Sequence, residues 1–313
     1  LAAFIDRVGA VFDLSGAKVV ERRSGPIPCG GCVAPLGRGN VLLVGDAAGM
    51  VSSSNVPGYG RVAEASAPAV AKALAAGAIL IGRNTMDQFA TGLNGTRAFA
   101  PLCRNAIDPD LIPGGSSSGS AVAVARGVVD FALGSDTGGS GRVPAAANGI
   151  VGLKPTPGIV SGRGMVYCNR TFDVIPVFAP TVAAAFRVFD AIRGPDPLDP
   201  FAYTGPTEAE APAGAPLAVL APRDLDFFGA APAEAAYRAN IERLAATGHS
   251  FGEIDFAPFR EAGRLVFESA LVAERLVDYG DFIETHPDAV AEPVRRAIDA
   301  GRGYTARDAF EAI

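Results

Sequence analysis

Two clusters of glycine and serine contain the residues of this sequence that could do nucleophilic chemistry. The first spans residues 114–120 and includes Ser116, and the second spans residues 135–144 and includes Ser140. Glycines beside a serine allow consecutive backbone N–H groups to point toward one place, where they can hold an oxyanion. Serine alone is a weak nucleophile, so this chemistry also needs a base within hydrogen-bond distance. The alternative is that both clusters are ordinary turns or linkers.

The segment between the clusters is suited to position them. Residues 121–133 are rich in Ala and Val, which predicts a short helix followed by a strand and argues against a linker. Upstream, a helix that begins near Pro68 and ends at Gly77 precedes an apolar strand at residues 78–81. Such alternation implies a mainly parallel sheet with helices on both faces, so the two loops would meet at one sheet edge.

Further elements follow downstream. A helix is expected from Thr181, with Val182, Phe186 and Phe189 as its core-facing stripe. Residues 217–220 predict another strand, and residues 234–246 predict an amphipathic helix that ends at a glycine.

The two clusters, together with the Gly-Leu-Lys-Pro-Thr-Pro-Gly segment at residues 152–158, resemble the amidase signature family, and among its members allophanate hydrolases. The resemblance implies an α/β fold, the amidase-signature α/β/α sandwich with a central mixed, mainly parallel sheet. It also implies hydrolysis of a linear amide C–N bond through a serine acyl-enzyme. Ser140 would be the nucleophile, and Ser116 would be a bridging serine beside a cis peptide bond. The implied oxyanion hole consists of the backbone N–H groups of Thr137, Gly138, Gly139 and Ser140.

The same resemblance implies substrate contacts. Residues 84–93 are similar to the family's loop beside the site, where Gly92 would contact substrate. Residues 264–275 look like the helical segment of allophanate hydrolases in which a tyrosine and an arginine hold the substrate carboxylate. Arg275 is retained, and its guanidinium suits a bidentate carboxylate contact, whereas Phe267 stands at the tyrosine position. The alternative is that Arg275 is a solvated helix residue paired with a glutamate.

The family's base, a lysine at the end of an upstream strand, has no counterpart by spacing. Aligning the apolar run 40–44 with that strand places Gly45 at the lysine position. The chain has three lysines, which are Lys18, Lys72 and Lys154. Lys72 is expected on an exposed helix face, and Lys154 belongs to the separate Gly-Leu-Lys-Pro motif. Asp46 is a poor substitute because an ordinary carboxylate, with a pKa of roughly 3.9, is too weakly basic. We therefore expect an impaired site.

Residues 1–54 differ from the rest of the chain. Residues 23–28 and 40–50 resemble the second flavin-binding motif of geranylgeranyl-reductase-like flavoproteins, which implies that Asp46 approaches a flavin's ribityl chain. No strand followed by G-x-G-x-x-G opens the chain, so the pyrophosphate cradle is missing and no cofactor is predicted. We predict a flavoprotein-like segment at residues 1–54 and an amidase domain at residues 55–313, truncated at both ends.

Composition limits the classes of partner. Hydrophobic residues make up 49% of the 313 residues, and the net charge of −6 argues against a nucleic-acid or anionic-membrane surface. No apolar run of about 18 residues predicts a membrane span, and Asp6 and Arg7 interrupt any signal peptide. The Cys29/Cys32 pair has no second pair or nearby histidine, so no metal site is predicted. We expect a cytoplasmic protein with a small-molecule amide substrate, and a homodimer is left open.

Three hypotheses from different classes stay open at this stage. The first is an amidohydrolase that acts on a small carboxylated urea such as allophanate. The second is a non-catalytic remnant of the same fold, which the glycine at the lysine position favours. The third is a flavin-binding module supported by residues 1–54 alone.

Overall fold

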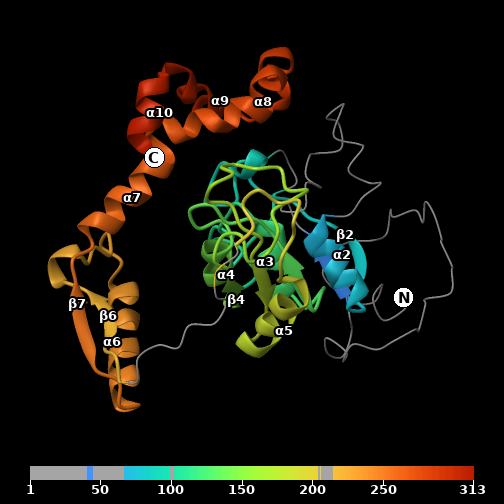
Figure 1. Ribbon diagram of the computed structural model, residues 1–313. Helices are drawn as coiled ribbons and strands as arrows, with labels where there is room; N and C mark the ends of the chain where they lie inside the picture. Colours follow the sequence, from blue (N-terminus) through green and yellow to red (C-terminus); the bar gives the residue numbers. More distant parts are fainter. Residues whose placement is uncertain (1–40, 45–66, 99–101, 204, 206–213) are drawn as a thin grey trace. The chain divides into compact units, whose positions relative to one another are not determined.

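The structure of the chain is a computed structural model that describes residues 41–44, 67–98, 102–203, 205 and 214–313 (Figure 1). The chain divides into two compact units. The first unit contains Leu1–Thr204 and Val272–Thr305, and the second contains Gly205–Leu271 and Ala306–Ile313. Within the described ranges, no helix has the length and apolar character needed to cross a membrane.

The first unit is built on a five-stranded sheet with the strand order β2-β1-β3-β5-β4. The strands are β1 (Val41–Val44), β2 (Ile79–Arg83), β3 (Phe131–Leu133), β4 (Val151–Leu153) and β5 (Val177–Ala179). Strand β1 pairs in parallel with both β2 and β3, whereas β5 runs antiparallel to β3 and β4. Two of the four pairings between the described strands of this sheet are therefore parallel. The predicted mixed sheet is confirmed.

Alternating side chains of the central strands build a core on each face of the sheet. Phe131 and Leu133 of β3 belong to one hydrophobic cluster, which includes residues of α2 (Pro68–Ala75) and α5 (Val182–Ile192). Ala132 lies between them in the sequence and belongs to the other cluster, with residues of α3 (Ser118–Ala125) and α4 (Arg142–Ala147). This period of two is what a strand covered on both faces requires. The predicted α/β/α layering is therefore present in the first unit.

Two further helices of the first unit pack against a loop near the sheet. Helices α8 (Glu274–Thr285) and α9 (Glu292–Asp299) form a third cluster, against which Phe89 packs. The phenyl ring of Phe89 lies 4.4 Å from the ring of Tyr279, centroid to centroid. Gln88 donates from its side-chain amide to the Ala289 carbonyl (2.7 Å) and accepts the Ala291 N–H (2.8 Å). These contacts attach α8 and α9 to the segment that runs from β2 toward α3.

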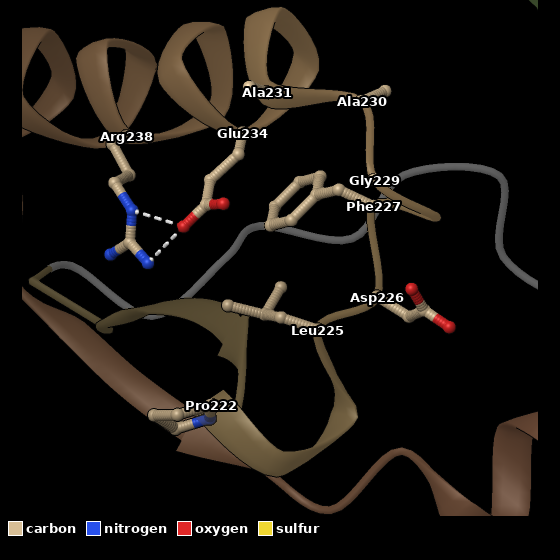
Figure 2. A pocket seen from close by; sticks show the side chains of 9 residues that line it. All are labelled: Pro222, Leu225, Asp226, Phe227, Gly229, Ala230, Ala231, Glu234 and Arg238. Carbon is tan, nitrogen blue, oxygen red and sulfur yellow. Dashed lines mark hydrogen bonds and ion pairs between the residues drawn. The ribbon is translucent and has the colours of Figure 1, made fainter.

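The second unit is smaller and contains the parallel pair of β6 (Leu217–Leu220) and β7 (Phe251–Ile254). Its helices are α6 (Ala231–Ala246), α7 (Ala257–Glu268) and α10 (Ala306–Ala312). Figure 2 shows a hollow where the segment before α6 meets that helix, with Leu225 and Phe227 beside the Glu234–Arg238 ion pair. None of the site residues expected from the sequence lines this hollow.

The core-facing stripe expected for α5 is only partly right. Val182 and Phe186 are 58% and 52% exposed, whereas Phe189 is partly buried and packs against the core. The fully buried residues of this helix are Ala185, Val188 and Ile192. Helix α5 packs against α2, whose buried residues are also small, and such close packing favours small side chains over phenyl rings. Thr181 does cap the helix as expected, since its hydroxyl accepts the Ala184 N–H at 3.1 Å.

The continuous helix expected at residues 264–275 is broken at Ser269. This residue is extended (φ −131°, ψ −178°) and ends α7. Its hydroxyl donates to the Leu265 carbonyl (2.6 Å) and accepts the Leu271 N–H (3.2 Å). A serine that bonds to nearby backbone groups offers the chain an alternative to continued helix.

Lys72 is not the exposed face residue expected from its alanine neighbours. Its amine donates to the carbonyls of Arg193 (3.1 Å) and Gly194 (3.3 Å), directly after α5. A cation at a helix C-terminus satisfies free carbonyls there and interacts favourably with the helix dipole.

Candidate active site

The two glycine-serine clusters lie side by side. The backbone N–H of Ser117 donates to the carbonyl of Ser140 at 3.3 Å. The Ser117 hydroxyl also donates to the Ser135 carbonyl (3.2 Å) and accepts the Ser135 N–H (3.1 Å). Ser116 and Ser140 are both buried, with 0% and 3% of their surfaces exposed. The structure thus brings the two candidate serines to one edge of the sheet, beyond the end of β3.

Ser116 has an unusual environment. The Gly115–Ser116 peptide bond is cis, and the Ser116 carbonyl accepts the Asp87 N–H at 2.9 Å. Its hydroxyl oxygen is buried, and the described part of the chain offers it no hydrogen-bond partner. Because an unpaired buried polar group costs roughly 1–3 kcal/mol, this hydroxyl suits a partner such as an amine or a bound ligand.

Both lysines in the described ranges have hydrogen-bond partners other than Ser116. Lys72 binds the C-terminal end of α5. Lys154 donates to the backbone carbonyl of Asp136 (2.9 Å), and its amine lies 3.7 Å from the Asp136 carboxylate. Burial lowers the pKa of Lys154. Lys18 lies outside the described residues.

The strand expected to end at the lysine position is present. Val44, the last residue of β1, pairs with Leu133, the last residue of β3. Because these strands are parallel, their carboxyl ends meet at the same sheet edge as the loop that contains Ser140. Gly45, which follows Val44 in the sequence, and Asp46 lie outside the described residues.

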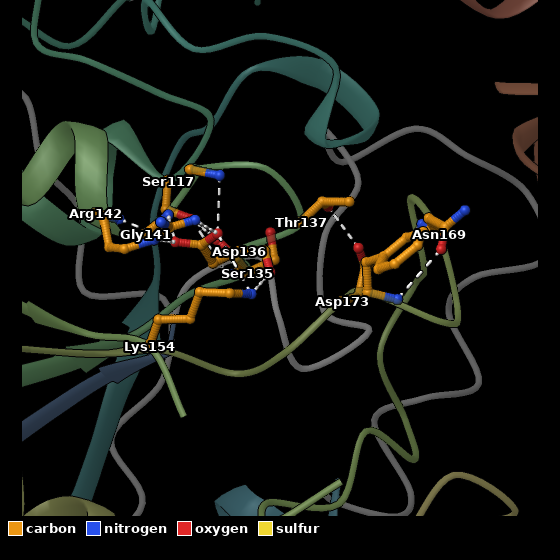
Figure 3. Close-up of polar contacts among 11 residues, drawn as sticks. Ser117, Ser135, Asp136, Thr137, Gly141, Arg142, Lys154, Asn169 and Asp173 are labelled. Carbon is orange, nitrogen blue, oxygen red and sulfur yellow. Dashed lines mark hydrogen bonds and ion pairs between the residues drawn. The ribbon is translucent and has the colours of Figure 1, made fainter. Parts of the chain in front are cut away.

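Asp136 anchors the loop that contains Ser140 (Figure 3). Its buried carboxylate accepts the backbone N–H groups of Gly139 (2.9 Å), Gly141 (3.0 Å) and Arg142 (3.1 Å). It also receives two hydrogen bonds from the Arg142 guanidinium, both at 3.0 Å. Burial raises the pKa of Asp136. The Arg142 hydrogen bonds and the charges of Lys154 and Arg142 lower it by a larger amount together, so the net pKa lies below its ordinary value.

The four N–H groups of the expected oxyanion hole differ in whether a described residue accepts their hydrogen bonds. The Gly139 N–H is engaged by Asp136, and Gly139 has a φ of +139°, which a side chain would disfavour. For the N–H groups of Thr137, Gly138 and Ser140, no acceptor is found among the described residues. Three backbone donors in this loop are therefore unengaged by described groups.

A second buried carboxylate lies on the other side of Thr137, as Figure 3 shows. Asp173 accepts the Thr137 hydroxyl (2.5 Å) and the N–H groups of Cys168 (2.6 Å) and Asn169 (3.2 Å). The sequence patterns did not identify Asp173 or Asp136 as site residues. A glycine-rich loop directly after Asp136 is a signal that could have found it, since Asp often bonds to the backbone of a following turn.

Arg275 lies near this cluster and is not a solvated helix residue. It is 4% exposed, and its Nε–H donates to the Cys168 sulfur at 3.0 Å. Its charge also acts on Asp173. Phe267 belongs to α7 of the second unit, where it is 46% exposed.

Gly92 packs against a third buried carboxylate, that of Asp87. A Cβ at Gly92 would lie 2.5 Å from Asp87 Oδ2, so a side chain at this position would displace the carboxylate. Asp87 accepts the N–H groups of Gly95 (3.0 Å) and Arg97 (2.6 Å). Burial raises the pKa of Asp87. The structure therefore gives Gly92 a packing role beside the Ser116 loop, and its substrate contact stays a prediction.

The titration of Asp173 gives a prediction for stability. Burial raises its pKa from 3.8 to about 6, so the folded chain holds this proton more tightly than the unfolded chain. The resulting stabilisation is complete below about pH 4 and is lost as the pH rises through about 6, a change of about 3 kcal/mol. Urea unfolding of the wild-type chain and of Asp173→Asn between pH 4 and 7 should show this loss in the wild-type chain alone. Parallel pH profiles would contradict it.

The cysteines show no metal site within the described ranges. Cys103 and Cys168 are free thiols, and burial raises the pKa of Cys103 to about 11. Among the described residues, no group of three or more His, Cys, Asp or Glu side chains could hold a metal ion. Cys29 and Cys32 lie outside these residues.

Comparisons with known proteins point to one family. The family described as Amidase matches residues 53–309. The urea amidolyase of Saccharomyces cerevisiae is 35% identical over 269 residues, which are 85% of this chain and 15% of that protein. The urea amidolyase of Lachancea kluyveri is 37% identical over 269 residues, with the same shares of the two chains. A solved allophanate hydrolase variant from Kluyveromyces lactis is 33% identical with a TM-score of 0.78, covering 88% of this chain and 46% of that one.

The chain thus spans 15% of the length of the yeast urea amidolyase and less than half of the Kluyveromyces lactis chain. The flavin-binding resemblance of residues 1–54 finds no support in these comparisons. Strand β1, whose residues the flavin-motif resemblance includes, is a member of the sheet that positions Ser140. By the extent of the family match and by its structural relatives, this chain belongs to the amidase family.

Proposed function

We propose that this chain is an amidohydrolase that acts on a small carboxylated urea such as allophanate. The reaction would proceed through an acyl-enzyme on Ser140. The observation that supports it most is the Ser117–Ser140 backbone hydrogen bond, which joins the two serine loops. This bond joins the residue after Ser116, whose hydroxyl is buried without a described partner, to a loop with three N–H groups that have no acceptor among the described residues. The similarity to urea amidolyase and allophanate hydrolase supports the substrate class.

In this proposal Ser140 Oγ attacks the terminal urea carbonyl carbon. The carbonyl oxygen becomes an oxyanion that the N–H groups of Thr137, Gly138 and Ser140 stabilise. The hydroxyl proton passes through Ser116 to a base and then to the departing nitrogen, which leaves as ammonia. Water then attacks the acyl carbon and gives one of its protons, through the same groups, to Ser140 Oγ as the acyl bond breaks, which releases the second product with a new carboxyl group. Arg275 binds the substrate carboxylate.

The proposed mechanism needs a base, and no described lysine bonds to the Ser116 hydroxyl. Lys72 and Lys154 are engaged elsewhere in the described structure, and Gly45 stands at the aligned lysine position. A positioned base contributes roughly 10²–10⁴-fold to rate, so we propose slow turnover. The same observation favours a second candidate, a non-catalytic member of the fold that keeps the loops and has lost the chemistry.

Covalent labelling tests the nucleophile directly. A fluorophosphonate probe is expected to label the wild-type chain at one site, identified as Ser140 by peptide mass spectrometry, and to leave Ser140→Ala unlabelled. Ammonia release from allophanate, measured with the same two proteins, tests the substrate. Ser161→Ala serves as the matched serine control, because the buried Ser161 hydroxyl bonds to Asp196 (2.7 Å) and Asp199 (3.0 Å) and has no part in the proposed chemistry.

The outcomes separate the two candidates. Labelling that is lost in Ser140→Ala and kept in Ser161→Ala supports the hydrolase. A wild-type chain that is neither labelled nor releases ammonia, although it is folded by circular dichroism, would leave the non-catalytic candidate. The homodimer and the cytoplasmic location stay predictions.

A further inference from the structure

We propose that Asp173 is a positioning residue that fixes the Ser140 oxyanion loop relative to the Arg275 guanidinium. This inference rests on the proposed function and deepens it, because it names what sets the spacing between the two ends of the substrate site. Asp173 itself touches neither the nucleophile nor, in the proposed mechanism, the substrate.

The first half of the connection is made through Thr137. Its side-chain hydroxyl donates to Asp173 Oδ1 at 2.5 Å, and its backbone supplies one of the three N–H groups that have no acceptor in the described part of the chain. Thr137 is 8% exposed and Asp173 is 7% exposed, so water competes little with this hydrogen bond. A hydrogen bond to an ionisable acceptor in a dry environment restricts the orientation of the residue that donates it.

The second half is made through Cys168. Asp173 Oδ2 accepts the Cys168 N–H at 2.6 Å, and the Cys168 sulfur accepts the Arg275 Nε–H at 3.0 Å. Cys168 and Arg275 are 2% and 4% exposed. With Nε engaged by the thiol, the guanidinium is held in one orientation by a fixed partner. A continuous buried series therefore runs from the oxyanion loop through Asp173 and Cys168 to Arg275.

A role confined to its own turn explains only some of the hydrogen bonds that Asp173 makes. The Asp173 backbone N–H donates to the Asn169 carbonyl (2.9 Å), and its carboxylate accepts two N–H groups of the same turn. Those bonds would stabilise the turn by themselves. The Thr137 bond joins residues 36 positions apart and reaches a loop whose other side is already held by Asp136. Asp136 and Asp173 bind the loop on opposite sides of Thr137, and together they restrict its orientation more than either carboxylate would alone.

Two substitutions cut the series at different ends. Thr137→Val has nearly the same shape but removes the hydroxyl, so it frees the oxyanion loop and leaves Arg275 in place. Asp173→Asn keeps an oxygen for Thr137 but turns an amide toward the backbone N–H groups of Cys168 and Asn169, so it loosens the Arg275 end. Thr137→Ser restores the hydroxyl. Thr181→Val, which removes the cap of α5 far along the sequence, is the matched control for lost stability.

Two measurements report on the two ends. The second-order rate of fluorophosphonate labelling of Ser140 depends on the oxyanion loop. The affinity for hydantoate, a stable urea that carries a carboxylate, compared with its uncharged amide, depends on Arg275. Removing one oxyanion donor lowers the catalytic rate roughly 10²–10³-fold, so displacing one should lower the labelling rate about tenfold.

We expect Thr137→Val to slow labelling about tenfold with hydantoate affinity nearly unchanged, and Thr137→Ser to recover the rate to within about twofold. Asp173→Asn should weaken hydantoate binding and leave binding of the amide unchanged. Thr181→Val should lower the melting temperature without changing either reading.

Unchanged labelling in Thr137→Val, or an equal loss in Thr181→Val, would overturn the positioning role while the proposed function stands. A folded wild-type chain that is neither labelled nor binds hydantoate would overturn the proposed function and this inference with it. If the wild-type chain binds hydantoate without being labelled, the proposed acylation fails. Hydantoate binding then decides the positioning role, and an Asp173→Asn affinity equal to that of the wild-type chain overturns it.

Discussion

Gly45→Lys is expected to raise the rate of Ser140 labelling and of ammonia release by about 10²-fold or more, because a positioned general base contributes roughly 10²–10⁴-fold. The expectation combines two observations. The Ser116 hydroxyl is buried without a partner among the described residues, and β1 ends one residue before Gly45, at the sheet edge where β3 leads into the Ser140 loop. A lysine amine held in a buried site has a lowered pKa and can accept the serine proton.

Gly45→Met is the matched control, since methionine supplies a side chain of similar length without the amine. It should label no faster than the wild-type chain. Adding Ser116→Ala to Gly45→Lys should abolish most of the gain, because the amine is proposed to act through the Ser116 hydroxyl. If Gly45→Lys and Gly45→Met behave alike while both remain folded, the missing lysine is not what limits this site.

Local sequence patterns predicted the parts of this fold that short-range chemistry controls. The apolar unit between the serine clusters does form α3 and β3, and Pro68 does begin α2, after which Gly77 adopts a φ of +93°. These outcomes depend on backbone freedom and on the alternation of side chains, which are written in neighbouring residues. The adjacency of the Ser116 and Ser140 loops followed because both flank one helix-strand unit.

Tertiary contacts account for what the sequence did not predict. The expected stripe of α5 is Val182, Phe186 and Phe189, but only Phe189 packs against the core, and the packing of α5 against α2 selects the small residues Ala185 and Val188 for full burial. The hydrogen bond between Thr137 and Asp173 spans 36 residues, and no periodicity relates two such positions. Likewise, Arg275 donates a hydrogen bond to the sulfur of Cys168, which lies 107 residues earlier in the sequence. Polar partners of this kind become visible only when the fold has brought them together.

The two carboxylates beside Thr137 illustrate how burial and partners decide a charge. Burial is the largest effect on Asp173 and raises its pKa to about 6, although hydrogen bonds from Thr137, Cys168 and Asn169 and the charge of Arg275 act in the opposite direction. Burial also raises the pKa of Asp136, yet Arg142 and Lys154 lie within ion-pair distance and lower it overall. One loop is therefore held by an acid that is readily protonated and by another that stays ionised. The ionised acid should carry the larger share of stability at neutral pH.

Asp136→Asn is expected to lower the free energy of unfolding by about 3–5 kcal/mol at pH 7, the usual cost of removing one partner from a buried charged network. Three backbone N–H groups lose a charged acceptor. Since the Arg142 side chain is 51% exposed, its ion pair is partly screened by water and contributes less.

Urea unfolding measures this difference, and the exposed Asp281→Asn on α8 is the control that should change stability little. The pH dependence gives a second reading. Because the folded pKa of Asp136 lies below its unfolded value, its contribution is complete above about pH 4 and is lost as the pH falls through the folded pKa. The gap between the wild-type chain and Asp136→Asn should therefore narrow in acid, opposite in direction to the Asp173 effect. A gap that stays constant from pH 7 down to pH 3 would show that Asp136 acts through shape alone, and that its charge does not hold the Ser140 loop.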